Sequence, residues 1–144
     1  MKKILISSIF CALLLSCSGN DNVNENCNFL LNIGVNAIVN LNLPQFSQLL
    51  IPANSAYVPN AGNGGVIVTN TGTGFVAWDA ADPNHAQSNC SFLNIVGGIQ
   101  GVCNCAEENT YSLITGQPLG NANLQCGLKF YQVQQSGSDL LISN

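Results

Sequence analysis

The sequence predicts an all-β fold, and three observations lead to that prediction. Apolar residues alternate with mostly polar neighbours at Val35, Ala37, Val39 and Leu41, and a period of two is typical of a half-buried strand. The apolar runs are short and are separated by Gly, Asn and Pro, which favour turns. Helical periodicity is hard to find along the chain. We therefore expect a small antiparallel domain, a β-sandwich or a small barrel, of roughly eight to ten short strands.

The strands are predicted from the apolar runs and from the turn residues between them. The first run ends before Pro44, and the Gly97-Gly98 pair predicts a hairpin between two later runs. Segments 70–74 and 136–139 are rich in Gly, Ser, Thr and Asn and predict two further hairpin connections. The expected strands lie at 35–41, 49–51, 56–58, 65–69, 75–79, 91–95, 100–103, 111–114, 131–135 and 140–143.

The N-terminal residues predict export and a lipid anchor. Lys2 and Lys3 precede an apolar run at 4–15, which is shorter than the roughly 20 residues that span a bilayer. The run ends before Cys17 in a sequence that resembles a bacterial lipobox, although an ordinary signal peptide with an incidental cysteine is the alternative. We expect a signal peptide at 1–16, a lipidated Cys17 followed by a flexible tether at 17–26, and a β domain at 27–144. This organisation predicts a lipid-anchored protein of the cell envelope whose first partner is the membrane.

The charge balance excludes several classes of function. Without residues 1–16 the chain keeps one cation, Lys129, against seven acidic residues, so that 1 − 7 = −6, and it has no arginine. Nucleic-acid binding is excluded because phosphate contacts need clustered cations. The glycine-rich segments lack the Gly-Lys-Ser/Thr of a phosphate loop, and the acidic residues do not follow a calcium-loop pattern. We expect no catalytic residues, and the sequence names no protein or small-molecule partner.

The cysteines predict disulfide bonds. Besides Cys17, the exported part holds five cysteines, and thiols in an envelope compartment tend to form disulfides. Because five is odd, two bridges and one free thiol are the maximum. The five are Cys27, Cys90, Cys103, Cys105 and Cys126.

A metal site is the alternative interpretation of the same residues. Zinc accepts three thiolates and one imidazole, which His85, Cys90, Cys103 and Cys105 could provide. The Cys103-Asn104-Cys105 spacing is tighter than the usual zinc pattern, and an oxidising compartment opposes free thiols. A further alternative is an activated thiolate formed by Cys103 and His85. A lone loop histidine is more often hydrogen-bonded or solvated.

Several segments follow one another in an order typical of a known family. Seventeen residues separate His85 from Cys103, and Cys103-Asn104-Cys105 is followed by Tyr111 and by Thr115-Gly116. A loop at 120–128 follows, and then a predicted hairpin that begins at Tyr131. From about Phe75 to its end the chain resembles the Rieske [2Fe–2S] family, which implies a Rieske-like β-sandwich. In that family the boxes Cys-x-His and Cys-x-x-His hold the cluster.

The departures from this pattern remove half of the cluster ligands. A Rieske centre uses two thiolates and two imidazoles. Pro83 stands where the first box has its cysteine, and Ala106 stands where the second box has its histidine. His85 is the only histidine of the chain, so a cluster of the Rieske type is not expected.

The resemblance also implies a disulfide pairing. In one branch of the family a bridge joins the two cluster loops, which corresponds here to Cys90–Cys105, with Cys90–Cys103 as the rival. Cys27 and Cys126 would form the second pair, and Cys103 would be left over. We therefore expect a non-enzymatic binding or accessory module without a cofactor. The alternative is an electron-transfer protein that carries a [2Fe–2S] cluster.

Overall fold

The computed structural model describes residues 26–144, so the signal peptide, Cys17 and the tether up to residue 25 lie outside the described part. Within it the chain forms ten strands and one short 3₁₀ helix. Their bounds are β1 (Asn36–Asn40), η1 (Pro44–Leu50), β2 (Ser55–Val58), β3 (Val66–Asn70), β4 (Phe75–Asp79), β5 (Leu93–Val96), β6 (Gln100–Cys103), β7 (Thr110–Ser112), β8 (Pro118–Leu119), β9 (Phe130–Ser136) and β10 (Asp139–Ser143).

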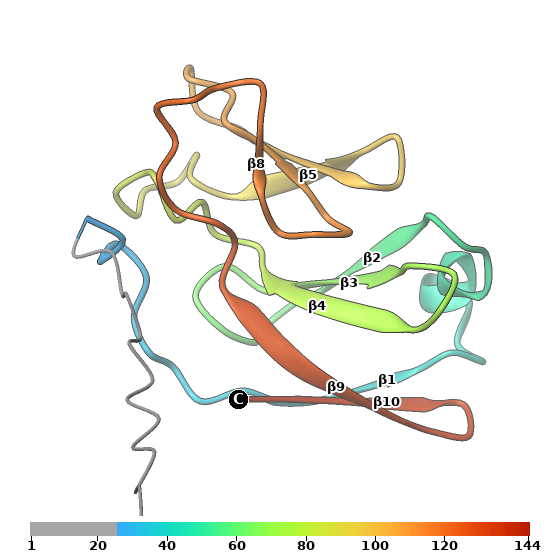
Figure 1. Ribbon diagram of the computed structural model, residues 1–144. Helices are drawn as coiled ribbons and strands as arrows, with labels where there is room; N and C mark the ends of the chain where they lie inside the picture. Colours follow the sequence, from blue (N-terminus) through green and yellow to red (C-terminus); the bar gives the residue numbers. More distant parts are fainter. Residues whose placement is uncertain (1–25) are drawn as a thin grey trace, which may run out of the picture.

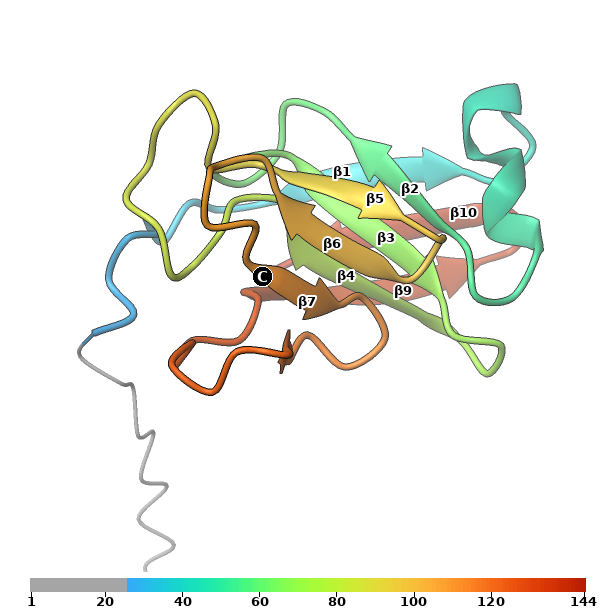
Figure 2. The ribbon, with the colours of Figure 1, turned by 90° about the horizontal axis from the view of Figure 1, so that it is seen from above.

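The strands form two antiparallel sheets. The larger has six strands in the order β1-β10-β9-β4-β3-β2, and the smaller has four in the order β5-β6-β7-β8. Strands β4 and β9 pair only through Ala77 with Tyr131 and Trp78 with Phe130. The large sheet bends at this short junction, so β1, β9 and β10 form the lowest of three tiers in Figure 1, with β2–β4 in the middle and β5 and β8 above. Figure 2 shows β5, β6 and β7 lying across β3 and β4.

Two hydrophobic cores fill the spaces between the tiers. Val66 and Val68 of β3 belong to the first core, together with residues of β1 and β10. Ile67, between them, points to the opposite face and belongs to the second core with Trp78 and Tyr111. Both faces of β3 are therefore covered, and Val66 to Thr69 are all buried. A strand in this position needs a continuous apolar run, which explains its sequence.

The predicted all-β class and the antiparallel arrangement are confirmed. All but one of the predicted strands overlap an observed strand. The exception is 49–51, where the prediction was wrong because residues 44–50 form the 3₁₀ helix η1. Pro44 suits the first turn of a helix, and Phe46 and Leu49 are buried on one side of it. The two-residue strand β8 was not predicted because its first residue, Pro118, cannot donate a backbone hydrogen bond.

Residues 26–144 contain no helix with the length and apolar character needed to cross a membrane.

Candidate functional site

Two loops at one end of the small sheet hold most of the residues that the sequence singles out. Loop 80–92 connects β4 to β5, and loop 104–109 connects β6 to β7. Both lie at the end from which β5 starts (Figure 2). A disulfide between Cys90 and Cys105 joins them, with 4.9 Å between the two Cα atoms. A second disulfide joins Cys27 to Cys126.

These are the two pairs that the Rieske resemblance implied. The rival pairing of Cys90 with Cys103 does not occur, and Cys103 is the free cysteine of the described chain. Cys103 is the last residue of β6 and points into the core between the sheets, whereas Cys105 lies in the loop beyond it. The strand ends at Cys103, and the turn that follows it places Cys105, not Cys103, against Cys90.

A buried carboxylate positions the first loop. Asp82 has no solvent exposure. Its oxygens accept hydrogen bonds from the hydroxyl of Tyr111, from Nδ2 of Asn109 at 2.8 Å and from the backbone N–H of Asn84 at 2.8 Å. Burial, and then the hydrogen bond to Asp82, raise the pKa of Tyr111 above its ordinary value. The Tyr111 hydroxyl therefore stays protonated and remains a donor to Asp82.

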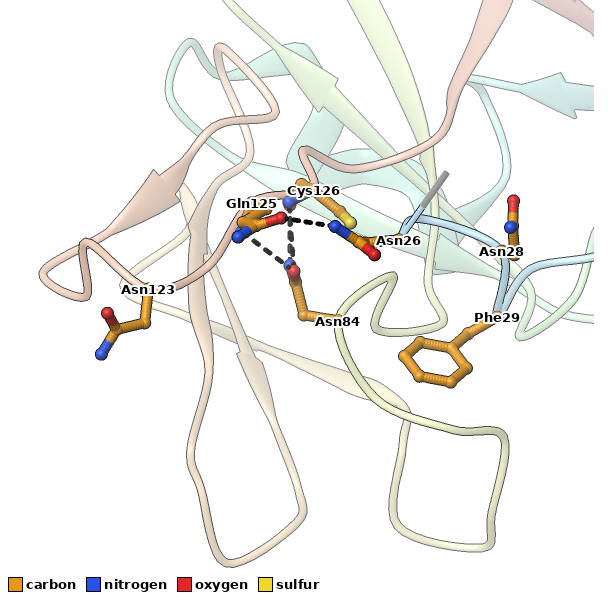
Figure 3. Close-up of a pocket in the computed structure, with 7 residues that line it drawn as sticks. All are labelled: Asn26, Asn28, Phe29, Asn84, Asn123, Gln125 and Cys126. Carbon is orange, nitrogen blue, oxygen red and sulfur yellow. Dashed lines mark hydrogen bonds between the residues drawn. The ribbon is translucent and has the colours of Figure 1, made fainter. Parts of the chain in front are cut away.

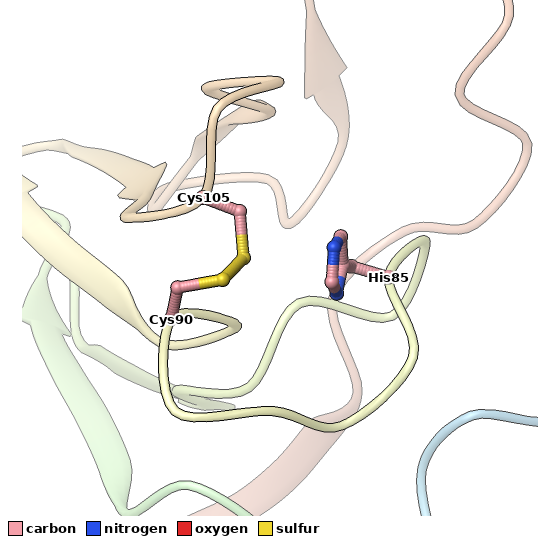
Figure 4. Close-up of side chains that lie close together, drawn as sticks. All are labelled: His85, Cys90 and Cys105. Atoms are coloured by element: carbon pink, nitrogen blue, oxygen red, sulfur yellow. A yellow bond between two sulfur atoms is a disulfide. The ribbon is translucent and has the colours of Figure 1, made fainter.

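His85 lies next to the disulfide in the same loop (Figure 4). Its Nδ1 is 2.6 Å from the carbonyl oxygen of Ala86, and its Nε2 is 3.8 Å from a carboxylate oxygen of Glu107. A carbonyl can only accept, so this contact places the imidazole proton on Nδ1 in the neutral ring and leaves the lone pair on Nε2. The donor atoms of His85, Cys90 and Cys105 lie within 4.8 Å of one another.

Cys103 does not belong to this group. Its side chain is 1% exposed, and its Sγ lies 3.8 Å from the backbone oxygen of Cys90. Burial raises the pKa of the Cys103 thiol to about 11. A thiol whose pKa is raised in this way is a poor nucleophile at neutral pH, so the hypothesis of a thiolate activated by His85 is not supported.

The donor set does not fit a Rieske cluster. Pro83 is buried and Ala106 is exposed, and neither side chain has an atom that could bind iron. Of the remaining positions, His85 offers one imidazole and Cys103 a buried, protonated thiol. The other two cysteines of the loops are bonded to each other. Two imidazoles and two thiolates cannot be assembled from these groups.

A second feature is an open hollow beside the Cys27–Cys126 disulfide (Figure 3). Its volume is about 660 Å³. The side chain of Asn84 reaches into it and fixes its wall: Oδ1 accepts from the backbone N–H groups of Gln125 and Cys126, at 3.2 and 3.1 Å. The lining carries no charged side chain and consists of Asn26, Asn28, Phe29, Asn84, Asn123, Gln125 and Cys126.

The sequence did not predict this hollow, nor the positions of Asp82, Ser88 and Glu107 around the disulfide. Asparagines and acidic residues in a turn-rich loop are expected for local reasons, so nothing in the local pattern distinguishes those that meet across the fold. The only available signal was the disulfide pairing itself, since it required the two loops to lie side by side.

No family model and no curated protein matches this chain. Solved structures do give matches. The ferredoxin of carbazole 1,9a-dioxygenase from Nocardioides aromaticivorans IC177 is 17% identical with a TM-score of 0.49, and the match covers 76% of this chain and 95% of that one. A putative NADH-dependent nitrite reductase small subunit from Mycobacterium tuberculosis is 15% identical with a TM-score of 0.44, covering 78% and 97%.

Proposed function

We propose that this chain is a lipid-anchored protein of the cell envelope whose Rieske-like β domain is a non-enzymatic binding or accessory module without an iron–sulfur cluster. The observation that carries the proposal is the Cys90–Cys105 disulfide. It joins the two loops that hold the cluster in the family that the sequence resembles. It does so where Pro83 and Ala106 replace two of the ligands.

The disulfide gives these loops a means of staying together that needs no metal. It closes a segment with a sequence separation of 15, for which chain entropy alone gives a stabilisation of about 3 kcal/mol. The hydrogen bonds that Asp82 accepts from Tyr111 and Asn109 add a second connection between the loops and the small sheet. We infer that the loops are kept as a fixed surface.

The hollow beside Cys126 supports a binding role. Its lining is polar and uncharged, and the exposed Phe29 adds an apolar face. Together these groups suit a neutral polar ligand or a loop of a partner protein better than an anion, because Lys129 is the only lysine or arginine in residues 26–144.

Metal analysis of the oxidised protein tests the absence of a cluster. The exported protein is purified from cells that supply clusters, and its visible spectrum, iron and acid-labile sulfide are measured. We expect a colourless protein with iron far below one atom per chain. A brown protein with stoichiometric iron and sulfide would overturn this proposal and establish the alternative, an electron-transfer protein with a [2Fe–2S] cluster.

Cell fractionation tests the anchor. Cys17→Ser removes the thiol that would carry the lipid, so the protein should move from the membrane fraction to the soluble envelope fraction. Cys11→Ser is the matched control because Cys11 lies inside the predicted signal peptide. That variant should stay with the membrane. If Cys17→Ser also stays there, the lipid anchor is wrong.

A further inference from the structure

We propose that reduction of the Cys90–Cys105 disulfide creates a site for one zinc-type divalent cation, bound by the two released thiolates, His85 and Glu107. This inference goes beyond the proposed function and does not depend on it. It differs from a Rieske centre in its ligands, because it uses the bridging cysteines and leaves Cys103 out.

The donor atoms are already close enough to surround one ion. One ring nitrogen of His85 and the two sulfurs lie within 4.8 Å of one another (Figure 4), and Glu107 Oε2 is 3.8 Å from His85 Nε2. Zinc bonds of about 2.0–2.3 Å in a tetrahedron place neighbouring ligand atoms roughly 3.3–3.8 Å apart. Small side-chain rotations after reduction are therefore sufficient to reach this spacing.

His85 has the orientation that a metal ligand needs. Its Nδ1–H donates to the carbonyl of Ala86, so Nε2 carries the lone pair and faces Glu107. Ligating histidines are commonly fixed in this way by a hydrogen bond from the other ring nitrogen. The His85 side chain is 25% exposed and that of Glu107 is 59% exposed, which leaves a path for an ion from solvent.

The surroundings suit thiolates that bind a cation. The hydroxyl of Ser88 lies 3.3 Å from Sγ of Cys90 and 3.9 Å from Sγ of Cys105, where it can donate to either sulfur. The only lysine or arginine in residues 26–144 is Lys129, whose Nζ instead donates to the carbonyl of Leu31. Within residues 26–144, no lysine or arginine therefore competes with a metal ion for the thiolates.

The loops have contacts that do not depend on the disulfide. Asp82 N–H donates to the carbonyl of Ser91 at 2.8 Å, and Asn109 donates to the Asp82 carboxylate. Asn104 N–H donates to the carbonyl of Phe92 at 3.1 Å, which connects the second loop directly to the first. We therefore expect the reduced thiols to remain near His85.

The redox step needs a dithiol reductant, either a protein or a small molecule. The dithiol supplies two electrons and two protons, the S–S bond between Cys90 and Cys105 breaks, two S–H groups form, and the reductant becomes a disulfide. Binding of the cation then forms two metal–sulfur bonds and releases the two thiol protons to solvent. The site thus binds metal in the reduced state and is closed by the disulfide in the oxidised state.

Zinc titration of the full exported protein in both redox states tests the proposal. The protein is reduced with a phosphine, and zinc is titrated in competition with a chromophoric chelator. We expect one zinc per reduced chain, release of about two protons per zinc, and no stoichiometric binding by the oxidised chain. Cobalt in place of zinc should give the thiolate-to-metal absorption band that shows sulfur ligation. Equal binding in both redox states, or no binding by the reduced chain, would overturn the proposal.

Matched variants separate this site from other thiols. Cys90→Ser with Cys105→Ser should abolish binding, whereas Cys27→Ser with Cys126→Ser should retain it in the reduced state. His85→Ala should weaken binding by at least about tenfold, and Cys103→Ser should leave it unchanged. Glu107→Gln, at an exposed position that folding tolerates, should also weaken it. If zinc affinity is the same in His85→Ala and Glu107→Gln as in the parent, binding is adventitious and the proposal fails.

Discussion

At the scale of single residues, Asp82 connects the first of the disulfide-linked loops to the second loop and to β7. It is fully buried, and it accepts hydrogen bonds from side chains that follow it by 29 and 27 positions, Tyr111 and Asn109. A buried carboxylate is costly unless its oxygens are satisfied, and here three donors satisfy them. Asp82 therefore has a structural role, and its carboxylate is not free for a ligand.

Asp82→Asn should destabilise the protein by about 2 kcal/mol. The new amide group would place a donor against the Nδ2 of Asn109 or the hydroxyl of Tyr111, so one buried hydrogen bond is lost and one donor is unsatisfied. Urea unfolding followed by fluorescence measures the change. Asp139→Asn, at an exposed hairpin position, is the control and should cost less than about 0.5 kcal/mol. Equal losses in the two variants would contradict the role of Asp82.

The buried thiol of Cys103 predicts a fall in stability at alkaline pH. Burial raises the pKa of Cys103 from 9.0 to about 11, so between these values the folded chain keeps a proton that the unfolded chain has released. Its stabilising contribution is complete below pH 9 and is lost as the pH rises towards 11. Burial is also the main reason why the pKa values of Tyr111 and Tyr131 are raised. These two groups therefore make the loss of stability steeper above pH 10.

Cys103→Ala should flatten the pH dependence of stability between pH 9 and 11. Urea midpoints at several pH values measure the slope, so any constant loss from the smaller side chain does not matter. An unchanged slope would show that Cys103 titrates normally in the folded protein.

At the scale of elements, the turn after β7 is shaped by one glycine. Gly116 has a φ of +72°, and a Cβ atom there would collide with the ring of Trp78. The indole Nε1 of Trp78 donates to the carbonyl of Leu113 at 2.7 Å, and Leu128 N–H donates to the carbonyl of Gly116. The close approach of this turn to β4 therefore closes one side of the second core.

Gly116→Ala should cost about 2–4 kcal/mol because it combines left-handed backbone strain with a clash against a buried ring. Gly137→Ala is the matched control: its φ is +59°, yet a Cβ there would meet nothing within 4 Å. That change should lower stability only through the left-handed backbone strain, by about 1–2 kcal/mol. Trp78 is the only tryptophan, so a shift of native fluorescence in Gly116→Ala alone would report the clash. Equal effects of both changes would show that the ring is not in contact.

At the scale of the whole molecule, the two disulfides constrain very different lengths of chain. Cys27–Cys126 has a sequence separation of 99 and connects the start of the described chain to the segment before β9. Cys90–Cys105 has a separation of 15 and acts within one end of the small sheet. By chain entropy, loops of about these lengths are stabilised by roughly 4.7 and 3 kcal/mol.

Removal of the long-range disulfide should therefore be the more damaging change. Cys27→Ser with Cys126→Ser should lower the free energy of unfolding by more than Cys90→Ser with Cys105→Ser, by about 1–2 kcal/mol. Denaturant unfolding of the two variants under identical oxidising conditions measures the difference. The reverse order would show that the loop pair depends on its disulfide more than its hydrogen bonds imply.

Much of the strand pattern could be predicted because it is local. The alternation around Val39 and the Gly97-Gly98 turn act over a few residues, and the structure has β1 and the β5–β6 hairpin there. The run at 49–51 was misassigned because three apolar residues show no period by themselves, and the preceding Pro44 started a 3₁₀ helix. The candidate site was predicted only in part: the disulfide pairs came from a family resemblance, and Glu107 was not foreseen beside His85.

The sequence by itself determined the all-β class and ruled out a complete set of Rieske ligands. The ligand set is incomplete because Pro83 and Ala106 cannot bind iron and the chain has a single histidine. No folding of one chain can supply a side chain that is absent. The tertiary structure decided which thiols meet, why Cys103 keeps its proton, and that His85 faces Glu107 beside the disulfide. The Cys90–Cys105 and His85–Glu107 contacts join loop 80–92 to loop 104–109, and residues so far apart in sequence meet only in the folded chain.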